Sequence, residues 1–196
     1  MYQKKYSKFG KVVIGTLAAA GIFMIPTAPY WVKQAGYVVY PPEADAPTVR
    51  LSDPDRLVIP RLGIDAPVIY AAEENEQAFQ GALKSGAVHY PGTSGIGEPG
   101  NAYIFGHSSD YIWSRGRYKT VFALLPKIQI GELVTVTDRE GYLYNYKVIE
   151  TKVVSPSDVS VLGDYGGARK LLTLQTSYPI GTAWRRFVAV AELVEE

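Results

Sequence analysis

The chain has 196 residues and a formal charge of +1, which is enough for one ordinary domain plus a short extension. The nearly balanced charge argues against nucleic acid as a partner, because no basic stripe stands out. The chain has no cysteine and two histidines, so disulfides are excluded and neither a zinc site nor any other cofactor is expected.

The N-terminal part differs in composition from the rest. Residues 1–11 contain four lysines and are interpreted as a basic cytoplasmic tail. Residues 12–32 carry no charged side chain and are long enough, as a helix, to cross the roughly 30 Å hydrocarbon core of a membrane. The lysines predict a single-pass anchor in the cell membrane, with its N-terminus inside and the rest of the chain outside.

Two prolines leave an alternative to this anchor. Pro26 and Pro29 shorten the uninterrupted apolar run to Val12–Ile25, which is also the length of a signal-peptide core. No clear cleavage site follows, which favours the uncleaved anchor, and the flanking lysines disfavour a buried core helix. Residues 33–55 contain four prolines and are interpreted as a linker, which leaves 56–196 as the main domain.

Within this domain, short apolar runs alternate with turn residues, which predicts an all-β fold. Asn75–Leu83 is a candidate helix with Asn75 as its cap, and Thr120–Leu125 is a second. Gly141 suggests a hairpin turn. Many strands with one or two short helices favour a closed β-barrel or a sandwich. The predicted strands are Leu57–Ile59, Ala66–Tyr70, Ala102–Phe105, Leu133–Thr137, Tyr142–Val153, Leu171–Gln175 and Phe187–Leu193.

Three polar residues stand at ends of these strands. His107 and Ser177 each follow an apolar run, and Arg186 precedes one. An imidazole can act as a general acid or base, a hydroxyl beside a base can be a nucleophile, and a guanidinium can stabilise an oxyanion. Taken singly, a loop histidine, a turn serine and a solvated arginine are the plainer interpretations. Arg185 and Arg186 should face opposite ways because side chains alternate along a strand.

The combination is more specific than its parts. It resembles the catalytic set of the sortases, which are transpeptidases that attach proteins to bacterial cell surfaces, and the resemblance covers roughly Leu57–Leu193. The segments that carry it are 87–93 (Ala-Val-His-Tyr-Pro-Gly-Thr), 97–101 (Gly-Glu-Pro-Gly-Asn), 105–107 (Phe-Gly-His), 122–125 (Phe-x-x-Leu), 131–132 (Gly-Glu), 173–176 (Thr-Leu-x-Thr) and 186–188 (Arg-Phe-Val).

The resemblance implies a closed eight-stranded barrel in which His107 ends the fourth strand, Ser177 ends the seventh and Arg186 begins the eighth. It implies cleavage of a Leu-Pro-x-Thr-Gly-like sorting signal at Thr–Gly and transfer of the acyl group to an amine. His107 is matched as the acid/base and Arg186 as the group that steadies the oxyanion, with Thr173 and Thr176 as substrate contacts.

The resemblance also implies partners. These are secreted proteins with a C-terminal sorting signal, and an amine acceptor from a cell-wall precursor or a pilin. The pattern is similar to sortases of class D or E.

Ser177 departs from the family signature, which ends in cysteine. A thiol has a pKa of about 8.5 and ionises beside an imidazolium, whereas a serine hydroxyl needs a base to remove its proton during attack. We therefore expect activity to fall by several orders of magnitude, with substrate binding largely intact. Asp110 could orient His107, although a solvated loop carboxylate is the plainer interpretation. His89 is expected to be structural.

Three functions stay open from the sequence. The first is a weakened or serine-dependent sortase-type transpeptidase. The second is a non-catalytic module on the same scaffold that binds sorting signals. The third is a serine hydrolase that uses Ser177 and His107, which the lack of a Gly-x-Ser-x-Gly motif disfavours.

Overall fold

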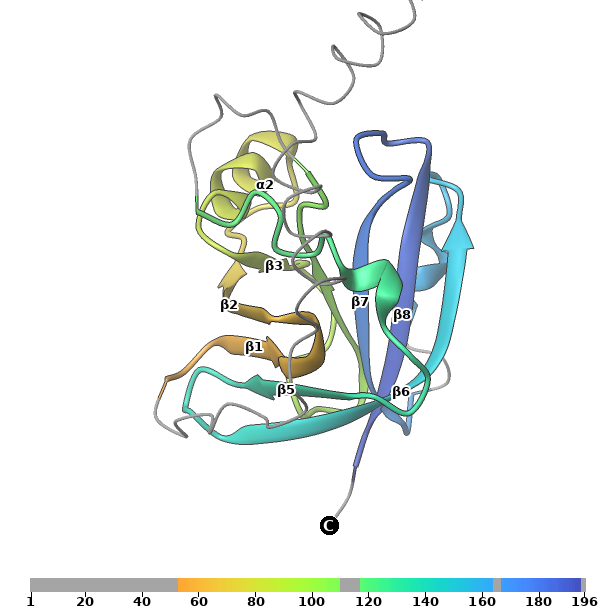
Figure 1. Cartoon of the computed structure of the whole chain (residues 1–196). Helices are drawn as coiled ribbons and strands as arrows, with labels where there is room; N and C mark the ends of the chain where they lie inside the picture. Colours follow the sequence, from red (N-terminus) through yellow and green to blue (C-terminus); the bar gives the residue numbers. More distant parts are fainter. Residues whose placement is uncertain (1–52, 110–116, 164–166, 195–196) are drawn as a thin grey trace, which may run out of the picture.

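The computed structural model describes residues 53–109, 117–163 and 167–194 (Figure 1). The predicted basic tail, the anchor at 12–32, nearly all of the predicted linker and Asp110 lie outside these residues. Within the described part of the chain, no helix has both the length and the apolar character needed to span a bilayer.

Eight strands close into one barrel in the order β1-β2-β3-β4-β7-β8-β6-β5, with β5 pairing back onto β1 (Figure 1). The predicted mainly-β barrel is therefore confirmed. The elements in chain order are β1 (Arg56–Ile59), η1 (Pro60–Leu62), β2 (Ile64–Tyr70), α2 (Glu76–Leu83), β3 (Ala87–His89), β4 (Gly100–Phe105), η2 (Leu125–Lys127), β5 (Leu133–Thr137), β6 (Leu143–Val154), η3 (Val159–Leu162), β7 (Lys170–Tyr178) and β8 (Arg185–Leu193).

β3 is the strand that the sequence pattern did not predict. Its three residues, Ala-Val-His, are all buried, so they show neither alternation nor the continuous apolar run that marks Leu57–Ile59. It pairs in parallel with β2, and parallel neighbours need a crossover, which α2 supplies. Gly86 permits the close approach, because a Cβ there would lie 2.2 Å from the carbonyl oxygen of Pro67.

Of the two predicted helices, the structure contains one and lacks the other. α2 is confirmed with its cap, since the Asn75 side chain accepts a hydrogen bond of 2.9 Å from the backbone N–H of Ala78. The helix predicted at Thr120–Leu125 is wrong. That segment forms successive turns that end in η2, where Pro126 has no N–H to continue an α-helical ladder.

The two faces of β7 belong to two separate apolar clusters. Leu172 and Leu174 are buried in the main cluster, where each fully buried leucine contributes about 2 kcal/mol. Leu171 faces the other way and packs in a second cluster with Val161 of η3. Because side chains alternate, Thr173, Gln175 and Ser177 share the face of Leu171.

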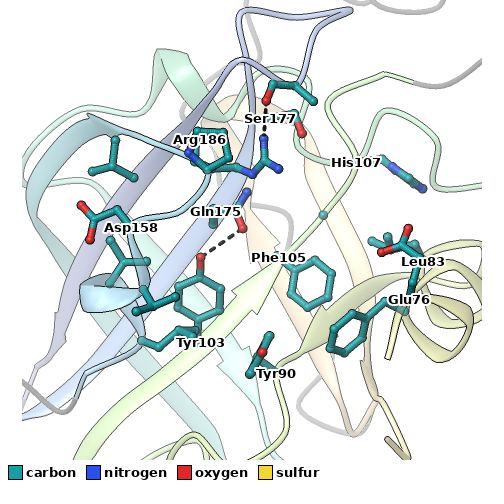
Figure 2. Close-up of a pocket in the computed structure, with 18 of the residues that line it drawn as sticks. Glu76, Leu83, Tyr90, Tyr103, Phe105, His107, Asp158, Gln175, Ser177 and Arg186 are labelled. Atoms are coloured by element: carbon teal, nitrogen blue, oxygen red, sulfur yellow. Dashed lines mark hydrogen bonds between the residues drawn. The ribbon is translucent and has the colours of Figure 1, made fainter. Parts of the chain in front are cut away.

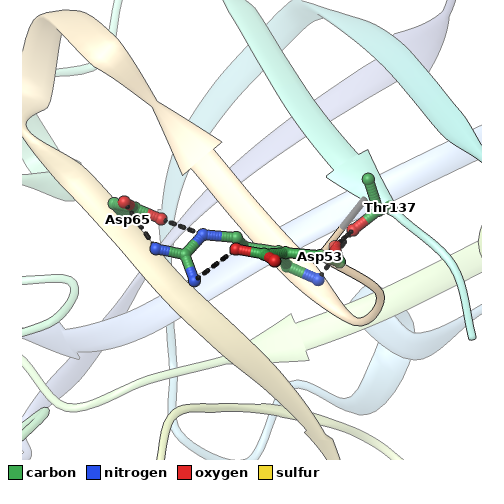
Figure 3. A network of polar contacts seen from close by, with 4 residues as sticks. Asp53, Asp65 and Thr137 are labelled. Carbon is green, nitrogen blue, oxygen red and sulfur yellow. Dashed lines mark hydrogen bonds and ion pairs between the residues drawn. The ribbon is translucent and has the colours of Figure 1, made fainter. Parts of the chain in front are cut away.

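The barrel closes at the start of the domain through a polar network on β1, β2 and β5 (Figure 3). The Arg56 guanidinium contacts the Asp65 carboxylate with two N–O distances of 2.7 Å. The Thr137 hydroxyl accepts from the Arg56 N–H and donates to the Asp53 carbonyl. The Arg56–Asp65 ion pair is partly solvated and contributes about 0–1 kcal/mol. The hydrogen bond from Thr137 fixes where residue 53 meets the barrel.

Candidate active site

Strand register brings the three predicted catalytic residues to one end of the barrel. Ser177 and Arg186 are directly opposite each other in the antiparallel β7–β8 pair, so their side chains share one face. β4 runs parallel to β7 with Phe105 opposite Gln175. His107 and Ser177 each follow that pair by two residues, which places them at the same end of these two neighbouring strands.

The loop that carries His107 is attached to β7 through both backbone groups of Gly106. The Gly106 N–H donates to the Gln175 carbonyl at 3.1 Å, and the Gly106 carbonyl accepts from the Thr176 hydroxyl at 2.9 Å. The His107 carbonyl then accepts from the Phe122 N–H at 2.9 Å. His107 therefore stands on a backbone fixed at three consecutive points.

A cleft of about 510 Å³ lies over this end of the outer face of the barrel (Figure 2). α2 forms one wall and η3 the opposite wall, while β4, β7 and β8 form the floor. His107, Ser177 and Arg186 all line it. In the view of Figure 2, Ser177 lies between Arg186 and the His107 imidazole. The structure thus brings the three residues together in one cleft.

The floor beneath the α2 wall is aromatic. The Phe79 ring on α2 meets the Phe105 ring edge to face, with ring centres 5.2 Å apart. Tyr90 lies 5.4 Å from Phe79 and 6.0 Å from Tyr103 by the same measure. Tyr103 also donates a hydrogen bond of 3.0 Å to the side-chain carbonyl of Gln175 (Figure 2). Such a surface suits an extended peptide with apolar side chains.

Arg186 is held in place by its own strand end. Its Nη1 donates to the carbonyls of Ala183 and Arg185, at 3.0 and 3.1 Å. Within the described residues its Nε and Nη2 donors make no protein hydrogen bond, so they can serve a ligand or a developing oxyanion. Arg185 is exposed and does not line the cleft, as strand alternation predicts.

The cleft also carries two carboxylates, Glu76 on α2 and Asp158 before η3. Hydrogen bonds from the side chain and then the backbone N–H of Ser160 hold the pKa of Asp158 below its usual value. On the aromatic floor, the hydrogen bond to Glu74 raises the pKa of Tyr90 to about 12, so this phenol stays neutral. No group of three His, Asp or Glu side chains that could hold a metal occurs in the described residues.

Thr173 and Thr176, which were predicted to contact substrate, do not line the cleft. Both side chains are fully buried and absent from the cleft lining. Thr173 donates to the side chain of Asn101, and Thr176 to the Gly106 carbonyl. They support the residues around the cleft and do not contact its contents. His89 is 6% exposed, bonded to the Ser94 carbonyl and stacked on Tyr70, as a structural residue would be.

Several lining residues escaped the sequence prediction. Tyr103, Phe105 and Gln175 lie on the strands that lead to His107 and Ser177, at positions of the same parity, so strand alternation could have identified them. The residues from α2 and η3 meet the strands only through long-range folding and give no local signal.

The fold and the site thus define a β-barrel protein with a Ser-His-Arg cleft at the end of its parallel β4–β7 pair. The sortase domain profile matches residues 57–194. The chain therefore belongs to the sortase family.

The chain is also similar to individual sortases. The chain is 34% identical over 95 residues to Sortase A of Listeria monocytogenes, a match that covers 43% of this chain and 41% of that protein. Among solved structures it is similar to sortase C-1 of Actinomyces oris, with 23% identity, a TM-score of 0.61 and coverage of 85% of this chain and 99% of that one. It is also similar to a Clostridium perfringens sortase D5, with 24% identity, a TM-score of 0.58 and coverage of 71% and 78%.

Proposed function

We propose that this chain is a sortase-type transpeptidase whose chemistry is strongly weakened by Ser177. The observation that carries the proposal is the register that sets Ser177 opposite Arg186 and at the same barrel end as His107, inside one cleft. Its substrates are secreted proteins that end in a Leu-Pro-x-Thr-Gly-like signal, and its acceptor is an amine of a cell-wall precursor or a pilin. The segment 12–32 anchors it in the membrane, with the barrel outside the cell.

In the proposed reaction the nucleophile attacks the carbonyl carbon of the Thr–Gly bond. Arg186 donates hydrogen bonds to the oxygen that becomes negative, and His107 gives a proton to the leaving amine. Ser177 has to lose its proton during the attack, and its hydroxyl makes no hydrogen bond within the described residues. The cleft can therefore bind and orient the peptide while lacking an activated nucleophile.

The test compares the full chain with its Ser177→Cys variant. The variant has a single cysteine, so any thioester with a sorting peptide is unambiguous in an intact-mass spectrum. We expect adducts and transfer to an amine with Cys at this position, and turnover lower by several orders of magnitude with Ser177, since a thiolate is far more abundant than an alkoxide. No adduct with any Leu-Pro-x-Thr-Gly-like peptide would refute the proposal.

A second candidate function is a module that binds sorting signals without cleaving them. The unactivated hydroxyl of Ser177 in an otherwise complete cleft favours it. Calorimetry with the same peptides on the unmodified chain distinguishes the two. Binding without slow turnover supports the binding module, and slow turnover supports the weakened enzyme.

A further inference from the structure

The wall of the cleft opposite α2 comes from the segment that follows β6. β6 ends at Val154, and residues 155–163 then leave the sheet, form η3 and bring Val159 and Leu162 to the cleft. Most hydrogen bonds of this segment are local, such as that from the Gly163 N–H to the Ser160 carbonyl. Local bonds shape the segment but do not fix its place relative to the barrel.

One barrel side chain reaches this wall. Asn101 on β4 is 1% exposed, and its Nδ2 donates a hydrogen bond of 3.1 Å to the Val161 carbonyl. Within the described residues this is the hydrogen bond that joins 155–163 to the barrel. The Val161 side chain packs at the same place in the outer apolar cluster. The polar contact and the buried apolar contact of the wall therefore coincide at Val161, while Leu162 packs against the edge of the same cluster.

Asn101 has a second hydrogen-bond partner on β7, which satisfies its side-chain oxygen. The Thr173 hydroxyl on β7 donates to Asn101 Oδ1 at 2.8 Å, while the Val161 carbonyl can only accept, so the amide has one satisfactory orientation. Asn101 pairs with Leu171, which places Thr173 one pleat further along the same face.

The face that carries this pair leads directly to the candidate nucleophile. The next pleat carries the hydrogen bond between Tyr103 and Gln175, and the one after it carries Ser177. The support of the wall and the position of Ser177 therefore belong to the same two strands.

We propose that Asn101 and Thr173 are positioning residues that hold the η3 wall at a fixed place beside Ser177 and thereby set the affinity of the cleft for peptide. The identity of the ligand rests on the proposed function, whereas the position of the wall does not. A loosened wall loses the contacts of Val159 and Leu162 with a peptide but leaves the candidate catalytic residues on their strands. The expected signature is a higher KM at an unchanged kcat.

The test uses three variants of the full chain. Thr173→Val removes the hydroxyl at nearly constant volume, and Thr173→Ser retains it. Thr137→Val is the matched control, because Thr137 is 1% exposed and donates to the Asp53 carbonyl at 2.7 Å, but lies on β5 and does not line the cleft.

Amide hydrogen exchange measures how firmly the η3 wall is held, without any substrate. In Thr173→Val we expect residues 159–163 to exchange about tenfold faster relative to the barrel strands, with protection restored in Thr173→Ser and unchanged in Thr137→Val. If the ratio of exchange in η3 to exchange in the barrel stays constant in Thr173→Val, the pair does not hold the wall and the proposal fails.

Steady-state kinetics in the Ser177→Cys background measures how the position of the wall affects KM and kcat. Thr173→Val should raise KM roughly five- to tenfold while kcat stays within about twofold, and Thr137→Val should change only the folded fraction. A lower kcat at constant KM would mean that Thr173 serves stability alone, and would overturn the proposal. If the Ser177→Cys parent processes no peptide, the proposed function fails, and the exchange measurement still decides whether the pair positions the wall.

Discussion

The Thr176 hydroxyl donates a hydrogen bond of 2.9 Å to the Gly106 carbonyl, and this bond joins the strand that carries Ser177 to the loop that carries His107. Thr176 is fully buried and Gly106 is buried, so water cannot replace the bond. The residue beside the candidate nucleophile therefore fixes the residue beside the candidate base.

Replacing Thr176 by valine tests this link. We expect Thr176→Val to lower the free energy of unfolding by about 1–3 kcal/mol, because a buried carbonyl loses its partner. In the Ser177→Cys background we expect kcat to fall, since His107 is no longer held beside the nucleophile. Urea unfolding and steady-state kinetics measure the two effects, and Thr176→Ser is the control that keeps the hydroxyl. An unchanged kcat per folded Thr176→Val molecule would contradict the link.

Gly106 is expected to tolerate no side chain. A Cβ at this position would lie 2.7 Å from the Phe122 ring and 2.8 Å from a Val121 methyl. Gly106→Ala should destabilise the fold by about 1–3 kcal/mol through overpacking. Gly81→Ala is a suitable control, because a Cβ there meets no atom within 4 Å. Equal unfolding midpoints for the two variants would show that the Phe122 segment adjusts freely.

The sequence predicted most of the strands for a physical reason. β5 has the predicted bounds, β6 is shifted by one residue from its predicted bounds, and the other predicted runs are extended by one to three residues at one or both ends, because alternation of apolar side chains marks the buried face of each strand. β3 was not predicted because its short run ends in a histidine, and η3 was not predicted because four residues are too few to show a helical period. The helix expected at Thr120–Leu125 failed because its apolar residues are buried in turns that stop at Pro126.

The candidate site was predicted less completely than the strands. His107, Ser177 and Arg186 stood out at strand ends, and the structure gathers them into one cleft. Thr173 and Thr176 were expected to touch substrate because they belong to the Thr-Leu-x-Thr segment of the family resemblance, but each is buried and hydrogen-bonded to another strand or loop. A sequence motif does not reveal which buried partner a hydroxyl finds.

The two adjacent arginines provide an internal comparison for oxyanion stabilisation. Arg186 lines the cleft opposite Ser177, whereas Arg185 is exposed and faces away from it. In the Ser177→Cys background, Arg186→Ala should lower kcat by roughly 10²–10³-fold, the usual loss for one oxyanion donor. Arg186→Lys should not restore it, because a point charge does not reproduce a planar fork of donors. Arg185→Ala is the matched control, and a comparable loss there would refute the assignment.

The pH dependence of stability should depend on His89. Burial lowers the pKa of its imidazole below the ordinary value of 6.5, although the Ser94 carbonyl, which accepts from Nε2 at 2.9 Å, partly opposes this. Between that lowered pKa and 6.5, the unfolded chain binds a proton that the folded chain does not. The stability contributed by neutral His89 is therefore fully present above pH 6.5 and is lost as the pH falls through this window, with no further loss below the folded-state pKa.

Unfolding in urea at a series of pH values between 4.5 and 7.5, about two units below to one above the ordinary histidine pKa, measures this contribution. His89→Phe keeps a ring against Tyr70, whose own ring is stacked on His89 with centres 4.8 Å apart, but it cannot titrate. We expect this variant to lose the part of the pH dependence that His89 supplies, even though the lost hydrogen bond to Ser94 lowers its stability at every pH. The chain's other histidine provides the control, since His107→Phe should retain that part. Identical pH profiles for the unmodified chain and His89→Phe would show that His89 does not couple protonation to folding.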